Sequence, residues 1–145
     1  MSISDIIHNR VLVSAIVAWA IAQLLKVIIV ALTSKRFDYT RFVGSGGMPS
    51  SHSALVMALT TKVGIVEGFK STSFAMALCF ALVVMYDAAG VRRAVGIQAR
   101  ILNNIMNDIS QKKPLEEKKL KELLGHTPVE VFAGAMLGIA IGIIV

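Results

Sequence analysis

The chain has 145 residues, of which 55% are hydrophobic and 17% charged, and its formal net charge is +6. This apolar content exceeds that of an ordinary soluble domain, and the length suits one domain only. Aromatic residues make up only 6% of the chain and no basic–aromatic recognition motif occurs, which argues against nucleic-acid binding. The basic residues instead flank long apolar blocks, as they do in proteins that meet anionic membrane lipids.

Four apolar blocks predict four transmembrane helices, and hence an all-α integral membrane bundle. The first block lacks the basic start and the cleavage site of a signal peptide, so we expect it to be retained. The second block is short and contains Lys62. The single cysteine of the chain, Cys79, lies in the third block and is expected to be buried. We predict one membrane domain, residues 1–145, with spans at residues 11–33, 51–68, 73–92 and 127–145.

A charged stretch separates the last two blocks, and residues 101–125 are predicted to form a loop with one surface helix, LEEKKLKELL. If each of the four blocks crosses the membrane once, the first and third helices end on the same side on which the second and fourth begin. This loop and all the polar motifs described below therefore lie on the same membrane face. Because the loop is rich in lysine, the positive-inside rule assigns that face to the cytoplasm. We therefore expect a multi-pass protein of the cell membrane whose polar motifs face the cytoplasm.

The glycine-rich turn GSGGMPSSHS comes directly before the second block. Glycines such as Gly47 let the backbone approach a ligand closely. Ser50, Ser51 and His52 then open a helix, whose free amides and dipole attract an anion. A serine N-cap accounts for Ser50 but leaves the other serines and the histidine unexplained. The turn is therefore predicted to bind phosphate, with His52 as a proton donor.

A second motif, GHTPVE, precedes the last block. Thr127 and Glu130 have the spacing of a capping box, and Pro128 suits the first helical position. This structural interpretation leaves His126 unexplained. Glu130 lies about one turn later and can hold one ring nitrogen of His126, which leaves the other nitrogen more nucleophilic. We favour that arrangement over a plain helix cap.

Four charged residues are predicted to complete the site. Asp87 lies at the edge of a membrane block, where ionisable residues are usually functional or paired. Arg92 and Arg93 offer planar forks for phosphate, with only one of them facing the site, and a snorkelling basic belt is the alternative. Lys26 shares a helix face with Gln23, and it either snorkels or points at a phosphate.

Other residues are assigned no chemistry. Gly134, Gly138 and Gly142 recur every four residues, which is typical of close helix packing and offers a face for a homodimer. His8 is interpreted as a surface residue without a partner. The histidines and carboxylates show no metal-binding spacing, and the adjacent arginines favour an anion, so we expect neither a metal nor a cofactor.

These motifs resemble those of the type 2 phosphatidic acid phosphatase (PAP2) superfamily, which includes vanadium haloperoxidases. PSSHS is similar to its P-S-G-H motif, and the stretch from His126 to Gly134 is similar to H-x-x-x-D-x-x-x-G. The strings GGMPSSHSA, DAAGVRR and GHTPVEVFAG resemble those of its small divergent branch, the YuiD-like proteins. The resemblance spans nearly the whole chain and implies a reduced PAP2-like core.

By this resemblance, His126 attacks phosphorus, Glu130 orients it and His52 protonates the leaving oxygen. Ser50 and the amides of Ser51 and His52 hold phosphate oxygens. Two parts of the superfamily pattern are not matched. The first motif of the superfamily is K-x6-R-P, but Thr33 stands seven residues after Lys26, at the position of the arginine. The third motif has S-R six residues before its histidine, and Leu120 stands there in this chain. We expect Arg92 or Arg93 to supply the missing cation.

The sequence thus predicts a metal-independent membrane phosphatase that hydrolyses a lipid phosphomonoester through a phosphohistidine intermediate. The expected partners are a lipid phosphate substrate, membrane lipids and a second copy of the chain. The alternative is a non-catalytic membrane protein that binds a phospholipid or anion in the same pocket. A small transporter is disfavoured because the chain lacks inverted repeats.

Overall fold

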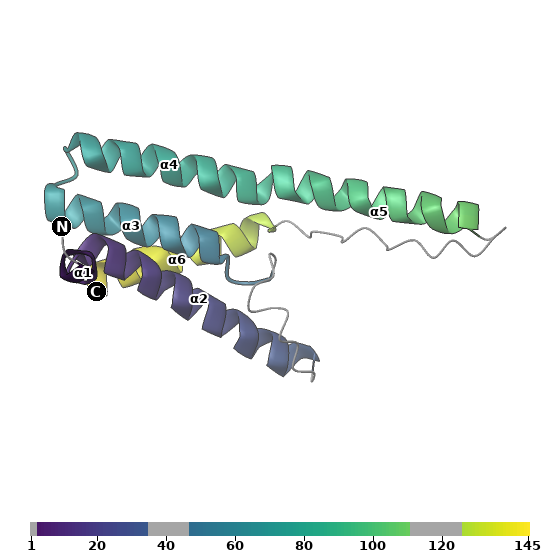
Figure 1. Cartoon of the computed structure of the whole chain (residues 1–145), viewed down its shortest axis with the longest axis horizontal. Coiled ribbons are helices and arrows are strands. Elements are labelled where there is room, and N and C mark those ends of the chain that lie inside the picture. The colour runs from purple at the N-terminus through teal and green to yellow at the C-terminus, as the bar shows by residue number, and fades with distance from the viewer. Residues whose placement is uncertain (1–2, 35–46, 111–125) are drawn as a thin grey trace.

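The computed structural model describes residues 3–34, 47–110 and 126–145, and every regular element in these ranges is an α-helix (Figure 1). The all-α prediction is therefore confirmed for the described part of the chain. The helices in chain order are α1 (Ile3–Ile7), α2 (Arg10–Ser34), α3 (Ser51–Glu67), α4 (Thr72–Ala89), α5 (Val91–Ser110) and α6 (Pro128–Ile144).

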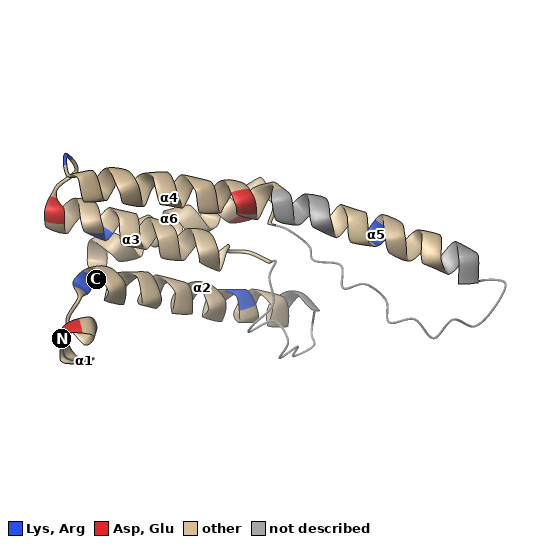
Figure 2. Ribbon diagram, turned by 45° about the horizontal axis from the view of Figure 1, so that its top comes forward, with Lys and Arg blue, Asp and Glu red and all other residues tan. Residues whose placement is uncertain are grey.

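The four apolar blocks correspond to α2, α3, α4 and α6. Two of these helices are long and apolar enough to cross a membrane, namely α2 over Arg10–Leu32 and α4 over Thr72–Ala89. The other two, α3 and α6, have 17 residues each. Most of the ribbon carries neither acidic nor basic residues (Figure 2). The crossing of the membrane by all four helices stays a prediction.

Helix α3 is the centre of the bundle and packs against α2, α4 and α6. The residues at its core are small: Ala18 and Ala22 of α2 meet Ala54 and Ala58 of α3, and all four are fully buried. Alanine side chains keep the helix axes close, so the bundle is held by tight contact between backbones rather than by large interlocking side chains.

The contact between α3 and α6 depends on the three glycines of α6. A Cβ atom on Gly134 would lie 2.2 Å from the carbonyl oxygen of Ser50, and one on Gly138 would lie 2.3 Å from that of Ala54. A Cβ atom on Gly142 would lie 2.8 Å from the Cβ of Thr61. The packing role predicted for the glycines is confirmed. Because α3 covers this face, a homodimer would have to use another surface.

Helix α5 continues from the end of α4 and extends away from the bundle (Figure 1). The two helices are separated at Gly90, whose amide donates to the carbonyl oxygen of Tyr86 at 2.9 Å. The predicted third span, residues 73–92, is thus divided at this glycine. Residues 101–110, which we expected in a loop, are helical. The expected surface helix LEEKKLKELL lies outside the described residues.

Two predictions about single residues are corrected by the structure. Cys79 is exposed on α4 instead of buried, because this helix is apolar on all sides and only part of its surface contacts the bundle. His8 is exposed as expected, but its ring is not without a partner, since Nδ1 lies 2.7 Å from the carbonyl oxygen of Ser4.

Candidate functional site

The start of α3, the end of α4 and the start of α6 meet at one end of the bundle. The amide of Ser50 donates to the carbonyl oxygen of Glu130 at 3.0 Å, and the amide of His126 donates to that of Ala88 at 3.1 Å. These bonds connect segments that lie far apart in the sequence. The polar motifs that we expected on one membrane face therefore do lie at the same end of the helices.

Thr127 starts α6 as its N-cap, and its hydroxyl accepts from the amide of Glu130 at 3.3 Å. The carboxylate of Glu130 in turn accepts from the amide of Thr127 at 3.0 Å, through Oε2. The same oxygen lies 3.1 Å from Nδ1 of His126. The capping box and the histidine–carboxylate contact were posed as alternatives, and the structure contains both. Glu130 thus fixes the helix start and the imidazole ring together.

The contact with Glu130 determines which nitrogen of His126 is available for chemistry. When Nδ1 donates to the carboxylate, a neutral imidazole carries its lone pair on Nε2. His126 is only 1% exposed and its Nε2 atom is buried. The ring is therefore held in one orientation by a charged partner and surrounded by the protein.

His52 brings a second imidazole to the same place. Its ring centroid lies 6.3 Å from that of His126, with the two planes at 63°. His52 is in the first turn of α3 and is exposed, whereas His126 is buried. The two histidines that the sequence singled out are thus neighbours, one open to the surroundings and the other held inside.

The serines before His52 are placed as parts of the helix start. Ser50 is the N-cap of α3 and is fully buried, and its hydroxyl oxygen accepts from the hydroxyl of Ser53 at 3.0 Å and from its amide at 3.4 Å. Ser51 is 3% exposed. Ser53, which we had not singled out, follows Ser50 at the spacing of a capping residue and its partner. The hydroxyl of Ser50 is engaged within the protein in this geometry.

Lys26 lies inside the bundle and does not snorkel to its surface. It is 1% exposed, and its Nζ donates to Oε1 of Gln23 at 2.9 Å. Gly47 lies over its methylene stem, since a Cβ atom on this glycine would be 3.3 Å from Cγ of Lys26. Gly47 also has a φ of 91°, which L-residues rarely adopt. Gly47 therefore covers a buried cation.

The third motif contributes from the end of α4. Asp87 is half-buried and precedes Ala88, whose carbonyl accepts from the amide of His126. Arg92 and Arg93 lie in the first turn of α5, just beyond this junction, and their side chains are outside the described part of the structure. Within the described residues, no group of three histidine, cysteine or acidic side chains is placed to hold a metal ion.

Comparison with known proteins identifies the family. The chain belongs to the divergent PAP2 family, whose model matches residues 7–141. It is similar to the uncharacterized membrane protein YuiD of Bacillus subtilis (strain 168), with 40% identity over 151 aligned positions that cover 97% of this chain and 96% of that relative. The family predicted from the motifs is thus confirmed, and with the apolar helices α2 and α4 it establishes a membrane protein. No solved structure matches the chain significantly.

Proposed function

We propose that this chain is a metal-independent phosphatase of the cell membrane that hydrolyses a lipid phosphomonoester through a phosphohistidine on His126. The proposal is supported by the arrangement of the two histidines. Nδ1 of His126 is held by the Glu130 carboxylate at 3.1 Å, while the ring of His52 stands 6.3 Å away. A nucleophile with its orienting group and a separate proton donor are what phosphoryl transfer through an enzyme intermediate requires.

The reaction follows in two steps. The lone pair on Nε2 of His126 attacks phosphorus, the bond to the lipid oxygen breaks, and His52 gives its proton to that oxygen. Water then attacks the phosphohistidine, His52 takes a proton from this water, and the P–N bond breaks to release inorganic phosphate and restore His126. The imidazolium that forms on His126 is stabilised by the carboxylate of Glu130.

The two rings are close enough for one phosphate group to contact both. Attack by nitrogen begins at about 3–3.5 Å from phosphorus, and a proton donor reaches its acceptor at about 2.6–3.2 Å. Because the ring centroids are only 6.3 Å apart, a bound phosphoryl group would lie beside the pair of rings, within reach of one nitrogen of each.

Fixed positive groups around this position would stabilise the transferring phosphoryl group. The amides of Ser51 and His52 lie in the first turn of α3, where helical amides lack an intrahelical acceptor. We assign Lys26 beneath Gly47, and Arg92 or Arg93 from α5, as the cations. Asp87 would hold one of these arginines. Ser50 contributes by fixing the helix start.

The lipid substrate is inferred from the position of the site at the ends of apolar helices. A membrane-embedded phosphomonoester presents its headgroup at that depth. Phosphatidic acid, phosphatidylglycerophosphate and polyprenyl phosphates share this chemistry. We further propose that α2, α3, α4 and α6 all cross the membrane, that residues 1–145 form one domain with the site on the cytoplasmic face, and that the chain pairs with a second copy.

A second candidate function is non-catalytic binding of a phospholipid or anion. The observation that favours it is the burial of Nε2 of His126, because an attacking nitrogen must reach phosphorus. The residues of the site would then bind a phosphate group without breaking its ester bond. The two functions share the same residues and differ only in turnover.

Phosphate release from phosphatidic acid by the purified full-length chain in mixed micelles distinguishes these functions. We expect release that a metal chelator does not change, and an acid-labile phosphoenzyme that can be trapped by rapid quenching. His126→Ala should remove both signals. His52→Gln should slow formation of the phosphoenzyme from alkyl phosphates by about 10²–10⁴-fold, but spare its formation from p-nitrophenyl phosphate, whose leaving group needs no proton.

Thr127→Ala is the matched control for the histidine–carboxylate contact. It removes the hydroxyl half of the capping box but leaves Glu130 beside His126, so turnover per folded molecule should be unchanged. Glu130→Ala removes both interactions and should lower turnover strongly. Phosphate release that requires an added divalent cation would refute the metal-independent mechanism. Binding of phosphatidic acid without any release would establish the second function.

A further inference from the structure

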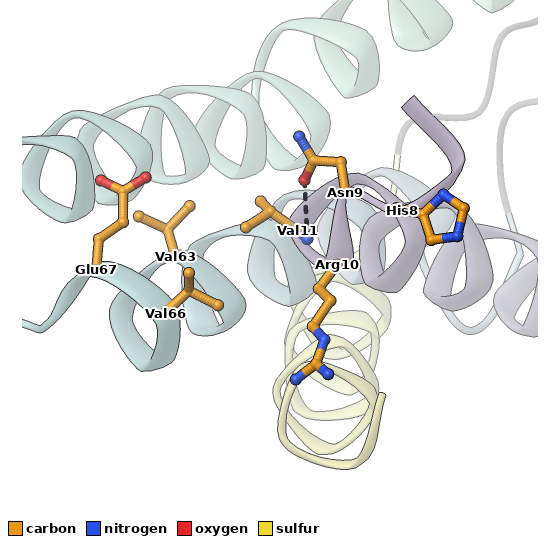
Figure 3. A pocket seen from close by; sticks show the side chains of 7 residues that line it. All are labelled: His8, Asn9, Arg10, Val11, Val63, Val66 and Glu67. Carbon is orange, nitrogen blue, oxygen red and sulfur yellow. Dashed lines mark hydrogen bonds between the residues drawn. The ribbon is translucent and has the colours of Figure 1, made fainter. Parts of the chain in front are cut away.

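A cavity of about 480 Å³ lies at the opposite end of α3 from the histidine pair (Figure 3). It is formed where the chain passes from α1 into α2 and where α3 ends. Its volume is within the usual range for ligand sites, about 300–1,000 Å³. The residues that line it are His8, Asn9, Arg10, Val11, Val63, Val66 and Glu67.

Two of the polar lining residues already have partners within the protein. Asn9 caps α2, and its Oδ1 accepts from the amides of Val11 and Leu12 at 3.1 Å each. His8 is tied to the carbonyl oxygen of Ser4. The groups left for a ligand are the guanidinium of Arg10 and the carboxylate of Glu67. Both side chains are exposed, and within the described residues neither takes part in an ion pair.

These opposite charges come from different helices and are separated by an apolar floor. Figure 3 places the three valines between Glu67 and Arg10. Val63 is 8% exposed and forms the inner part of the floor, whereas Val66 is 56% exposed and borders the opening. A ligand that suits this lining has an anionic group for Arg10, a cationic group for Glu67 and an apolar portion that contacts the valines.

The depth of the cavity indicates where such a ligand comes from. Arg10 is the first residue of the apolar segment of α2 that is long enough to cross a membrane. A cation at this position lies at headgroup level, and guanidinium binds phosphate through paired hydrogen bonds. The carboxylate of Glu67 lines the same cavity and would attract an amine attached to that phosphate.

We propose that this cavity binds the headgroup of a zwitterionic aminophospholipid in the leaflet opposite to the histidine pair. Arg10 binds the phosphate, Glu67 binds the ammonium group, and the valines contact the glycerol and the first acyl carbons. This assignment does not depend on phosphatase activity, because it uses none of the residues at the other end of α3.

The test measures which lipids stay bound to the purified full-length chain, by native mass spectrometry after release from micelles. The probes are phosphatidylethanolamine and phosphatidylglycerol with identical acyl chains. We expect the wild type to retain phosphatidylethanolamine preferentially. Arg10→Gln should weaken retention of both lipids by about tenfold, the scale of a lost charge-assisted hydrogen bond. Glu67→Gln should remove the preference between them.

Lys70→Gln is the matched control, since Lys70 is an exposed cation in the turn after α3 but does not line the cavity. It should leave lipid retention at the wild-type level. Circular dichroism and elution volume verify that each variant is folded. Equal retention by wild type and Arg10→Gln, or a wild-type preference for phosphatidylglycerol, would overturn the proposal.

Water-soluble competitors separate the headgroup from a free anion. Phosphoethanolamine should displace bound phosphatidylethanolamine at concentrations at which inorganic phosphate does not, because only the former engages Glu67. If inorganic phosphate competes equally well, the cavity is a simple anion site and the assignment of Glu67 is wrong.

Discussion

At its first turn α3 carries His52 beside the buried His126, whereas at its last turn it carries Glu67 beside an open cavity. Both ends hold histidine, a cation and an acid, so composition does not distinguish them. The difference lies in how the backbone is connected. The first end is closed by hydrogen bonds from Ser50 to Glu130 and from His126 to Ala88. The last end has no such connection between α2 and α3 within the described residues.

The same types of side chain thus acquire different functions through packing. A ring held by a carboxylate and surrounded by protein is oriented before any ligand arrives, which chemistry requires. Exposed side chains that line an open cavity can adjust to a ligand, which suits recognition of a mobile lipid headgroup. The histidine end is therefore the candidate for catalysis, and the cavity end the candidate for binding.

The largest effect is expected from Gly134→Ala, which disrupts the packing of α6 against α3 at the histidine end. The new Cβ would lie 2.2 Å from the carbonyl oxygen of Ser50, so α3 and α6 must separate. We expect a loss of about 3 kcal/mol in the free energy of unfolding. Thermal unfolding in detergent measures it.

Ala140→Val is the control for added bulk on α6, because Ala140 is exposed. It should leave the melting temperature unchanged. Folded Gly134→Ala protein should lose phosphate release but still retain aminophospholipid at the Arg10 end. If the variant melted like the wild type, the backbone contact would not be what closes the histidine end.

The next prediction compares two buried lysines that lie toward opposite ends of the bundle. Lys26 is 1% exposed and lies under Gly47, and Lys62 is 6% exposed near the last turns of α3. Lys26→Met should lower phosphate turnover on the order of 100-fold, as removal of a positioned donor does. Lys62→Met should leave turnover unchanged and raise the melting temperature, because a buried ammonium group is costly in an apolar bundle.

Turnover is measured by the phosphate-release assay, and the melting temperature by thermal unfolding of the same preparations. An equal loss of turnover in the two variants would mean that the effect comes from general destabilisation. A loss of turnover in Lys62→Met alone would contradict the assignment of Lys26 as the catalytic cation.

Local features of the site could be predicted from the sequence, because they depend on spacing within one helix turn. The contact of His126 with Glu130 and the cap at Thr127 follow from residues three and four positions apart. The proximity of His52 and His126 followed from counting helices, because two successive antiparallel helices return the chain to the end of the bundle at which it started.

Contacts between distant segments could not be predicted in the same way. Nothing in the order of residues indicates that Gly47 lies against the stem of Lys26, or that Arg10 and Glu67 share a cavity, because these contacts depend on how far α2 is shifted along α3. Cys79 was assigned to the wrong environment for a related reason. A helix that is apolar all round gives no signal of which side faces its neighbours.

The smallest effect is expected from Ser50→Ala, which separates capping from substrate binding. The superfamily resemblance assigns Ser50 to phosphate, whereas its buried hydroxyl accepts from the amide and hydroxyl of Ser53. If capping is its role, the variant should lose about 1 kcal/mol of stability, with KM unchanged.

Ser71 provides the matched comparison, because it caps α4 at the opposite end and its hydroxyl accepts from the amide of Phe74 at 3.1 Å. Ser71→Ala should also lower stability without changing KM, but by less, since Ser71 is half-buried and water can replace its hydroxyl. Kinetics on phosphatidic acid and thermal unfolding measure both variants. An increase of KM in Ser50→Ala alone, with unchanged stability, would show that this hydroxyl turns toward phosphate when substrate binds. The histidine end would then rearrange on binding, and the contrast between an oriented end and an adjustable end of α3 would no longer hold.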